Sequence, residues 1–520
     1  MKKIIIFFIT VLTITSCSKD FLNETNPNSL ASDTFWKTGG DVDKAFAGVF
    51  SQLQSNDFYN GNSSGQNAGP YRLDFISDNG YCNYNFINGS GIARGDHSPT
   101  DGLVNSFWTA CYKMIQRSND FLGNVDRVKT VSEVNRTTMK SEVRFLRALA
   151  YHHLAMCYRD APLITKTQTL DEAKVPKNSY KELSDFVISE LSDITKGTEL
   201  PTTVVKGRVS KGAALALLAR FYLYNKNFTE AAVTAQKVID LAQYNLATPY
   251  NTLFTIAGES SKDVIFAVQY EGPGLAAGVG ASFNGYFPAA PQVHTVALPN
   301  LANAYYCTDG LPITSSPLYS ATNKTLNRDP RFNATLVTTG SMFRGAAILA
   351  TNLAPTTIRL RKWADEAALN STNAFDNAQD FYVLRYAEVL LTRAEALLES
   401  GVYTEQQVRD LVNQVRTRAT MPKVETVEGK GGITLTKQQL IDIVRQERRV
   451  ETAFEGLRYY DLKRWGILKQ RSVDVYMSVD KVQASAIQNR IFNEARHNVW
   501  PIPQREIDAN SALLQHPEWQ

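Results

Sequence analysis

Apolar residues return along the chain at the spacing of an α-helix, in blocks separated by polar stretches. In residues 104–122 they recur every three or four positions, with Trp108 among them, so this tryptophan is expected in the core. Residues 137–158 repeat the pattern, and Pro162 follows at the point where the helix must end.

Two longer segments are typical of paired helices. Residues 210–241 are expected to form two helices with a turn near 225–227, and residues 386–418 repeat that plan. In both, a small residue (Ala219, Ala394) precedes the aromatic that opens the second helix, as in tetratricopeptide repeats. Because the units have no fixed period, the sequence predicts a mostly α fold, a framework of tetratricopeptide-like helix pairs with insertions.

Other stretches have the chemistry of loops. Residues 55–102 and 272–295 are rich in Gly, Asn, Ser and Pro, with aromatic residues scattered among them. Short strands are expected at 264–270 and 334–339. The helical framework should therefore carry a loop-rich face with minor β structure.

The N-terminus has the regions of a signal peptide. A basic start is followed by an apolar stretch from 4 to about 14 and then by Ser16 and Cys17, an order that resembles a bacterial lipobox. Residues 1–16 are therefore predicted to be removed, leaving Cys17 as a lipidated N-terminus and 17–34 as a polar tether. An ordinary secretory signal, with Cys17 incidental, is the alternative.

The net charge and the cysteine content bear on possible partners and on disulfide bonds. The formal charge is +4, and removing Lys2 and Lys3 with the signal leaves 53 basic against 51 acidic residues, so nothing favours nucleic acid as a partner. The remaining cysteines are widely spaced and resemble no disulfide framework, so buried free thiols are expected. They are Cys82, Cys111, Cys157 and Cys307.

Catalytic motifs are missing from the sequence. It contains no P-loop, no nucleophile elbow and no His pair at helical metal-binding spacing, and its glycine clusters lack the dinucleotide-binding spacing. We therefore expect no cofactor and no metal ion. A pair of carboxylates facing each other across a cleft has no sequence signature, so a glycoside hydrolase stays open.

The stretch ERRVETAFEGLRYYDLKRW (447–465) has the residue types of a catalytic cleft. Its glutamates Glu447, Glu451 and Glu455 recur every fourth residue, and like charges at that spacing repel along an isolated helix. The repulsion is relieved if neighbouring helices supply arginines that form ion pairs with the row. We therefore favour a structural role, in which these ion pairs hold helices together, over catalysis. The candidate partners are Arg144, Arg147, Arg385 and Arg393.

A helix is expected from Ile441 to about Glu455, with Gly456 as its C-terminal cap and a short helix continuing to Trp465.

Several motifs, in order, resemble those of the SusD/RagB family of outer-membrane nutrient-uptake lipoproteins of Bacteroidetes. They are Cys17 with Phe21-Leu22, Phe107-Trp108 with Asn119–Leu122, Glu142–Ala148, Gly207–Ala219, Asp329–Phe332, Val383–Leu391, Glu447–Trp465 and Trp500–Ile507. The end, Leu514–Trp519, departs from the family's usual Asn-Pro-Gly-Tyr-like close.

This resemblance implies one SusD-like domain over 35–520, with an N-terminal part at about 35–225 and a C-terminal part at about 260–520. It further implies a non-catalytic, lipid-anchored protein of the cell outer membrane, exposed at the surface. Such proteins form a lid over a SusC-like TonB-dependent transporter, and loop aromatics capture oligosaccharide or, in some members, peptide.

Candidate ligand contacts follow from location and chemistry, because aromatic rings stack on sugar faces while amides bind hydroxyls. For each, the alternative is an aromatic that anchors its own loop. The candidates are Tyr81, Tyr84, Asn85 and Phe86 in the first insertion, Phe283, Tyr286 and Phe287 in the second, and Trp363 after a basic run. An enzyme, or a protein scaffold whose loops bind nothing, are the other functions considered.

Overall fold

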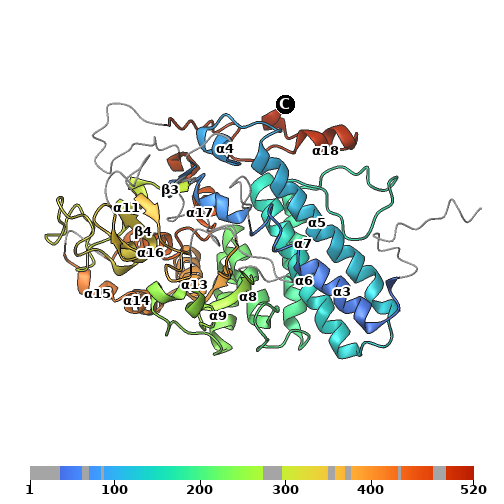
Figure 1. The fold of residues 1–520 in the computed structure, drawn as a ribbon, viewed down its shortest axis with the longest axis horizontal. Helices are drawn as coiled ribbons and strands as arrows, with labels where there is room; N and C mark the ends of the chain where they lie inside the picture. The colour runs from blue at the N-terminus through green and yellow to red at the C-terminus, as the bar shows by residue number, and fades with distance from the viewer. Residues whose placement is uncertain are drawn as a thin grey trace, which may run out of the picture.

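The computed structural model describes residues 35–60, 69–82, 87–272, 295–348, 358–368, 376–430, 435–471 and 488–520 (Figure 1). The predicted signal peptide, Cys17 and the tether lie outside these residues. Within them, no helix combines the length and the apolar character needed to cross a bilayer.

A group of long helices forms one end of the molecule. It comprises α3 (Gly39–Phe50), α5 (Gly102–Asn124), α6 (Glu133–Tyr158) and α7 (Tyr180–Lys196), with α6 packed between α5 and α7 (Figure 1). The two amphipathic segments recognised in the sequence are α5 and α6. Side chains accept hydrogen bonds from the first turns of α5, α6 and α7, which fixes where these helices begin.

Both predicted helix pairs are confirmed. They are α8 (Lys211–Tyr224) with α9 (Phe228–Asp240), and α13 (Tyr386–Ser400) with α14 (Glu405–Arg418). The pairs stack because α13 packs against both α9 and α14. Ala219 and Ala394 are 1% and 0% exposed, so small side chains lie where the helices approach.

The segment around the charged stretch differs from the expectation. α16 (Lys437–Glu451) ends at Glu451, and α17 (Arg458–Arg464) follows after a turn. The turn contains two residues with positive φ, Phe454 (59°) and Gly456 (79°), so Gly456 shapes the turn and does not cap α16.

Among the described residues, the strands pair in four small antiparallel sheets. They are β2 (Val264–Val268) with β8 (Phe381–Arg385), β1 (Gly80–Cys82) with β3 (Thr295–Ala297), β4 (Leu336–Thr338) with β7 (Ile358–Leu360), and β5 (Met342–Phe343) with β6 (Ala346–Ala347). The expected strands at 264–270 and 334–339 thus exist in shorter form. The β1–β3 pair joins the two loop-rich stretches to each other.

The described residues also contain short helices. The α-helices are α4 (Ser90–Arg94), α10 (Tyr250–Leu253), α11 (Pro299–Ala304), α12 (Pro330–Thr335), α15 (Val424–Val427) and α18 (Gln504–Ala509). The 3-10 turns are Pro70–Asp74, Val125–Arg127, Ile256–Gly258, Leu468–Arg471 and Pro517–Trp519.

One large apolar core runs through the N-terminal and C-terminal parts. Trp108 (2% exposed) belongs to it, as the sequence predicts, and so does Trp500 (0%). Cys82, Cys111, Cys157 and Cys307 are buried and unpaired, which confirms the expectation of free thiols.

Candidate functional site

The glutamate row of the charged stretch is buried and paired, so it does not face an open cleft. Glu451 is 0% exposed and forms ion pairs with Arg331 (3.1 Å), Arg385 (3.0 Å) and Arg418. Arginines from three other elements therefore converge on one carboxylate of α16.

Its two neighbours in the row are paired in the same way. Glu447 lies 2.6 Å from Arg331 and 3.4 Å from Arg416. Glu455 lies 2.7 Å from both Lys362 and Arg385. The interpretation of this row as a structural ion-pair contact between helices is confirmed.

The partners are largely not those expected. Arg385 is the one candidate that pairs with the row. Arg144 and Arg147 bind Glu190 of α7, and Arg393 donates to the carbonyl of Ala232 in α9, because their faces of α6 and α13 point to those helices. These three predictions are wrong.

The electrostatics of Glu451 also oppose acid catalysis. Burial by itself raises the pKa of Glu451, but Arg418, Arg385 and Arg331 outweigh burial and hold that pKa well below its usual value. A catalytic acid of a glycoside hydrolase needs a raised pKa and access to substrate. Glu451 has neither.

Two arginines of the same stretch bind residues next to the paired strands β1 and β3. Arg458 holds the buried carboxylate of Asp78 through two hydrogen bonds of 2.7 and 2.8 Å. Arg449 donates to Asn79 Oδ1 (3.0 Å), just before β1, and to Asn300 Oδ1 (2.6 Å), just after β3. The stretch thus holds the described residues that flank β1 and β3.

Asp74 makes a second link between the first insertion and the charged stretch. Its carboxylate accepts hydrogen bonds from the backbone N–H groups of Phe454 (3.1 Å) and Gly456 (2.6 Å) and from Asn79 Nδ2 (2.9 Å). Burial raises the pKa of Asp74 to about 6 in spite of these donors. Arg490 closes the arrangement by donating to the carbonyl of Gly80 (2.8 Å).

Two of the eight candidate ligand residues lie in the described part of the chain. Tyr81 is in β1 and packs with Val296 and Leu298, and its side chain is 6% exposed. The remaining six candidates lie outside the described residues: Tyr84, Asn85, Phe86, Phe283, Tyr286 and Phe287.

Trp363 requires a correction. It is 0% exposed, stacks on Phe381 with ring centroids 5.2 Å apart, and donates its indole N–H to the carbonyl of Phe454 (2.8 Å). A ligand at the surface does not reach this ring. Trp363 instead anchors the segment after β7 to the core, which is the alternative that the sequence left open.

A polar hollow of about 320 Å³ lies in the first insertion, next to β1, and sequence reasoning missed it. Its side chains can both donate to and accept from hydroxyl groups, as sugar binding requires. Arg94 and Asp96 in its wall bind each other at 2.8 Å. Other lining residues are Asn88, Ser90, His97, Ser98, Thr100 and Asp101.

Family models match the two parts of the chain. A model described as "SusD family" matches residues 262–519, and one described as "Starch-binding associating with outer membrane" matches residues 20–223. Together they reach from the expected tether to the C-terminus.

Curated relatives match over most of their length. "SusD-like protein P2" of Formosa agariphila is 28% identical, with 89% of this chain and 91% of the relative covered. "Starch-binding protein SusD" of Bacteroides thetaiotaomicron is 24% identical, with 77% and 76% covered.

Solved structures share the fold. A SusD-like carbohydrate-binding protein from Bacteroides fragilis superposes with a TM-score of 0.82 at 26% identity, covering 92% of this chain and all of that one. A laminarin-binding SusD-like protein gives a TM-score of 0.73 at 23% identity, covering 93% of this chain, and at that identity it supports the fold alone.

Proposed function

The chain belongs to the SusD/RagB family, and from this premise we propose that it is a non-catalytic surface lipoprotein that captures an oligosaccharide. It then passes the oligosaccharide to a SusC-like TonB-dependent transporter in the outer membrane. The observation that carries the proposal is the match of both family models, one of them described as starch-binding and associated with the outer membrane.

The chemistry of the chain supports glycan capture. The relatives include a starch-binding protein, and the 26%-identical structure is that of a carbohydrate-binding protein. The first insertion supplies a hollow lined by hydroxyl, amide, carboxylate and guanidinium groups. Ring stacking by Tyr84 and Tyr286, with hydrogen bonds from such groups, gives the modest affinity that suits release to a transporter.

Calorimetric titration of the chain from residue 18 against plant, fungal and host glycans tests the proposal. We expect one glycan class to bind, and Tyr84→Ala or Tyr286→Ala to weaken binding about tenfold, since loss of a stacked ring costs on the order of 1 kcal/mol or more. Tyr403→Ala, at the turn between α13 and α14, is the matched control and should bind as the wild type does.

Three results would contradict oligosaccharide capture, and each would point to a different function. Binding of a peptide digest in place of glycans identifies a peptide-binding member of the family. Release of new reducing ends from a glycan identifies an enzyme. Failure to bind either ligand, with recovery of a transporter in a pull-down, leaves a protein scaffold.

A further inference from the structure

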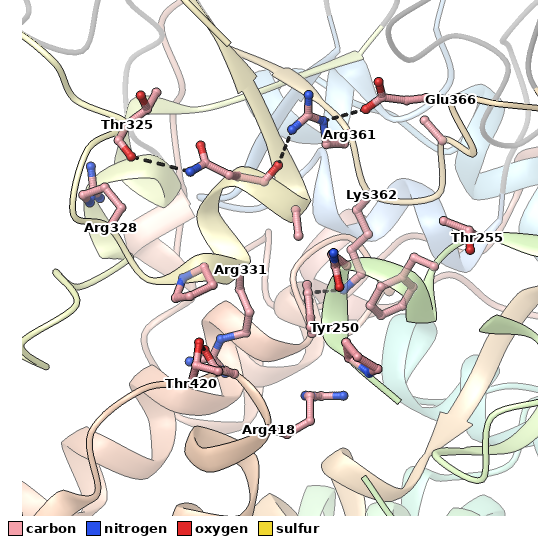
Figure 2. A pocket seen from close by; sticks show the side chains of 18 of the residues that line it. Tyr250, Thr255, Thr325, Arg328, Arg331, Arg361, Lys362, Glu366, Arg418 and Thr420 are labelled. Carbon is pink, nitrogen blue, oxygen red and sulfur yellow. Dashed lines mark hydrogen bonds and ion pairs between the residues drawn. The ribbon is translucent and has the colours of Figure 1, made fainter. Parts of the chain in front are cut away.

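A cavity of about 950 Å³ opens in the C-terminal part of the chain, between α10, α12, the segment after β7 and the end of α14 (Figure 2). Its volume is near the upper end of the range of about 300–1,000 Å³ found for small-molecule sites. It shares no lining residue with the hollow in the first insertion.

Positive charge predominates in the cavity wall. In Figure 2, Arg361 and Glu366 lie along one side, Arg418 lies opposite, and Lys362 lies between them. The cationic lining side chains are Arg328, Arg331, Arg361, Lys362 and Arg418, against the two carboxylates Asp365 and Glu366.

The buried ion network presents its positive side to this cavity. Arg331, Lys362 and Arg418 line it, whereas the carboxylates that pair with them, such as Glu451 and Glu455, do not. In this network the cations therefore face the cavity, and the carboxylates lie on the side away from it. Such an arrangement attracts an anion even though the network is close to neutral.

One of the cations has no carboxylate to offset it. The guanidinium of Arg328 donates to the carbonyls of Ala302 (2.5 Å), Tyr305 (2.7 Å) and Lys324 (3.0 Å), and its Nε has no hydrogen-bond partner. Among the described residues, no carboxylate oxygen lies within ion-pair distance of it. The cation also lies over the ring of Phe332 (4.5 Å), and an anion brought into the cavity stabilises this 4% exposed residue further.

The remaining lining groups favour a sugar over a highly charged anion. Both wall carboxylates already accept hydrogen bonds, Asp365 from the backbone N–H of Ile256 (3.1 Å) and Glu366 from that of Arg344 (2.7 Å). They repel a polyphosphate but accept from hydroxyl groups. Rim residues add hydroxyls and amides, namely Asn251, Thr255, Thr308, Thr325, Asn327, Asn333 and Thr420.

We propose that this cavity is a second binding site, and that it takes an acidic saccharide, a sugar chain that carries a carboxylate or sulfate group. The anionic group lies against Arg361 and Arg328, and the sugar hydroxyls bind the rim.

Titration calorimetry with a galacturonic acid tetramer, a sulfated galactose tetramer and neutral maltotetraose tests the site. Glu366→Gln removes a negative charge and the 2.9 Å ion pair with Arg361, while Arg361 keeps its hydrogen bonds to the carbonyls of Asn333 and Met342. It should raise the affinity for an acidic tetramer by about two- to fivefold, the range for a partly exposed pair. A gain of affinity cannot arise from misfolding.

Arg361→Met should weaken the same binding by about tenfold or more, as expected for loss of a hydrogen-bonded charge. The matched control is Arg409→Met on α14, an arginine paired with Glu405 that does not line the cavity and should leave the affinity unchanged. The wild-type affinity should also fall as salt is raised.

The acidic-sugar site is overturned if maltotetraose binds as tightly as the acidic tetramers, if sodium sulfate alone binds as tightly, or if Glu366→Gln and Arg361→Met change affinity in the same direction. These outcomes do not bear on the proposed capture of an oligosaccharide by the loops, because that proposal is tested by the variants of Tyr84 and Tyr286. Failure of those variants leaves the cavity result standing.

Discussion

Each glutamate of the row Glu447, Glu451 and Glu455 is held by cations that come from distant parts of the chain. Glu451 binds Arg331, Arg385 and Arg418 while 0% exposed, so it replaces its hydration with ion pairs. A partly exposed pair such as Arg445 with Glu399, at 27% and 24% exposure, keeps much of its water. Burial, more than the number of pairs, therefore sets what each residue contributes to stability.

Glu451→Gln should lower the free energy of unfolding by about 3–5 kcal/mol, because it leaves buried arginine charge without its carboxylate. Glu399→Gln should cost less than about 1 kcal/mol. Urea unfolding followed by circular dichroism measures both. Equal losses in the two variants would contradict the network as a buried anchor.

Asp74 should give stability a pH dependence of the opposite sign to that of most carboxylates. Burial raises its pKa from 3.8 to about 6 in the folded state, so folding favours the protonated form. Its contribution is complete below about pH 4 and is lost as the pH rises through 6. The change should be on the order of 2–3 kcal/mol, at about 1.4 kcal/mol per pKa unit.

Urea midpoints between pH 4 and 7 test this contribution. Relative to the wild type, Asp74→Asn should remove the loss of stability with rising pH, whatever its effect on absolute stability. Asp43→Asn, at an exposed position of α3, is the control. Parallel pH profiles for wild type and Asp74→Asn would show that Asp74 does not titrate in this window.

The turn between α16 and α17 decides how these two elements meet the first insertion. Gly456 has φ +79°, donates its N–H to Asp74, and approaches Pro70 so closely that a Cβ atom would lie 2.5 Å from the Pro70 carbonyl oxygen. The family motif thus places a glycine where a side chain would force the helices away from the insertion.

Gly456→Ala and Gly401→Ala form a matched pair for this point. Both glycines have positive φ, +79° and +76°, but a Cβ on Gly401 meets no atom within 4 Å. Gly401→Ala should cost about 1–2 kcal/mol of backbone strain. Gly456→Ala should cost at least about 2 kcal/mol more because of the clash. Similar thermal midpoints for the two variants would remove the close approach as the reason for glycine.

Over the whole molecule, segments near the C-terminus form hydrogen bonds with segments from the N-terminal part of the chain. The backbone N–H of Trp500 donates to the carbonyl of Cys157 at the end of α6 (2.9 Å), and Lys177 donates to the carbonyl of Leu514 (2.8 Å). Arg449 of α16 donates to Asn79 before β1 and to Asn300 after β3. These described segments are thereby attached to the helical framework.

Anchoring of the whole protein should depend on Cys17. Cys17→Ala should move the protein from the membrane fraction to the soluble fraction, because each buried methylene of a lipid chain contributes about 0.8 kcal/mol. Ser18→Ala should stay with the membrane. Fractionation with a carbonate wash, and mass spectrometry of the N-terminal peptide, measure the outcome. A wild-type protein without acyl groups would identify an ordinary secretory signal.

The sequence by itself determined the helix pairs α8–α9 and α13–α14, the amphipathic helices α5 and α6, and the family, because these follow from local spacing and motif order. The sequence pointed to Arg385 as one partner of the glutamate row, whereas only the tertiary structure shows that Arg331 and Arg418 also approach it. It also decided that Trp363 is buried and that Arg361 and Lys362, just before it, border a cavity. The basic residues before Trp363 and the motif Asp329–Phe332 are visible in the sequence. Spacing along the chain, however, does not show which side chains line the same cavity.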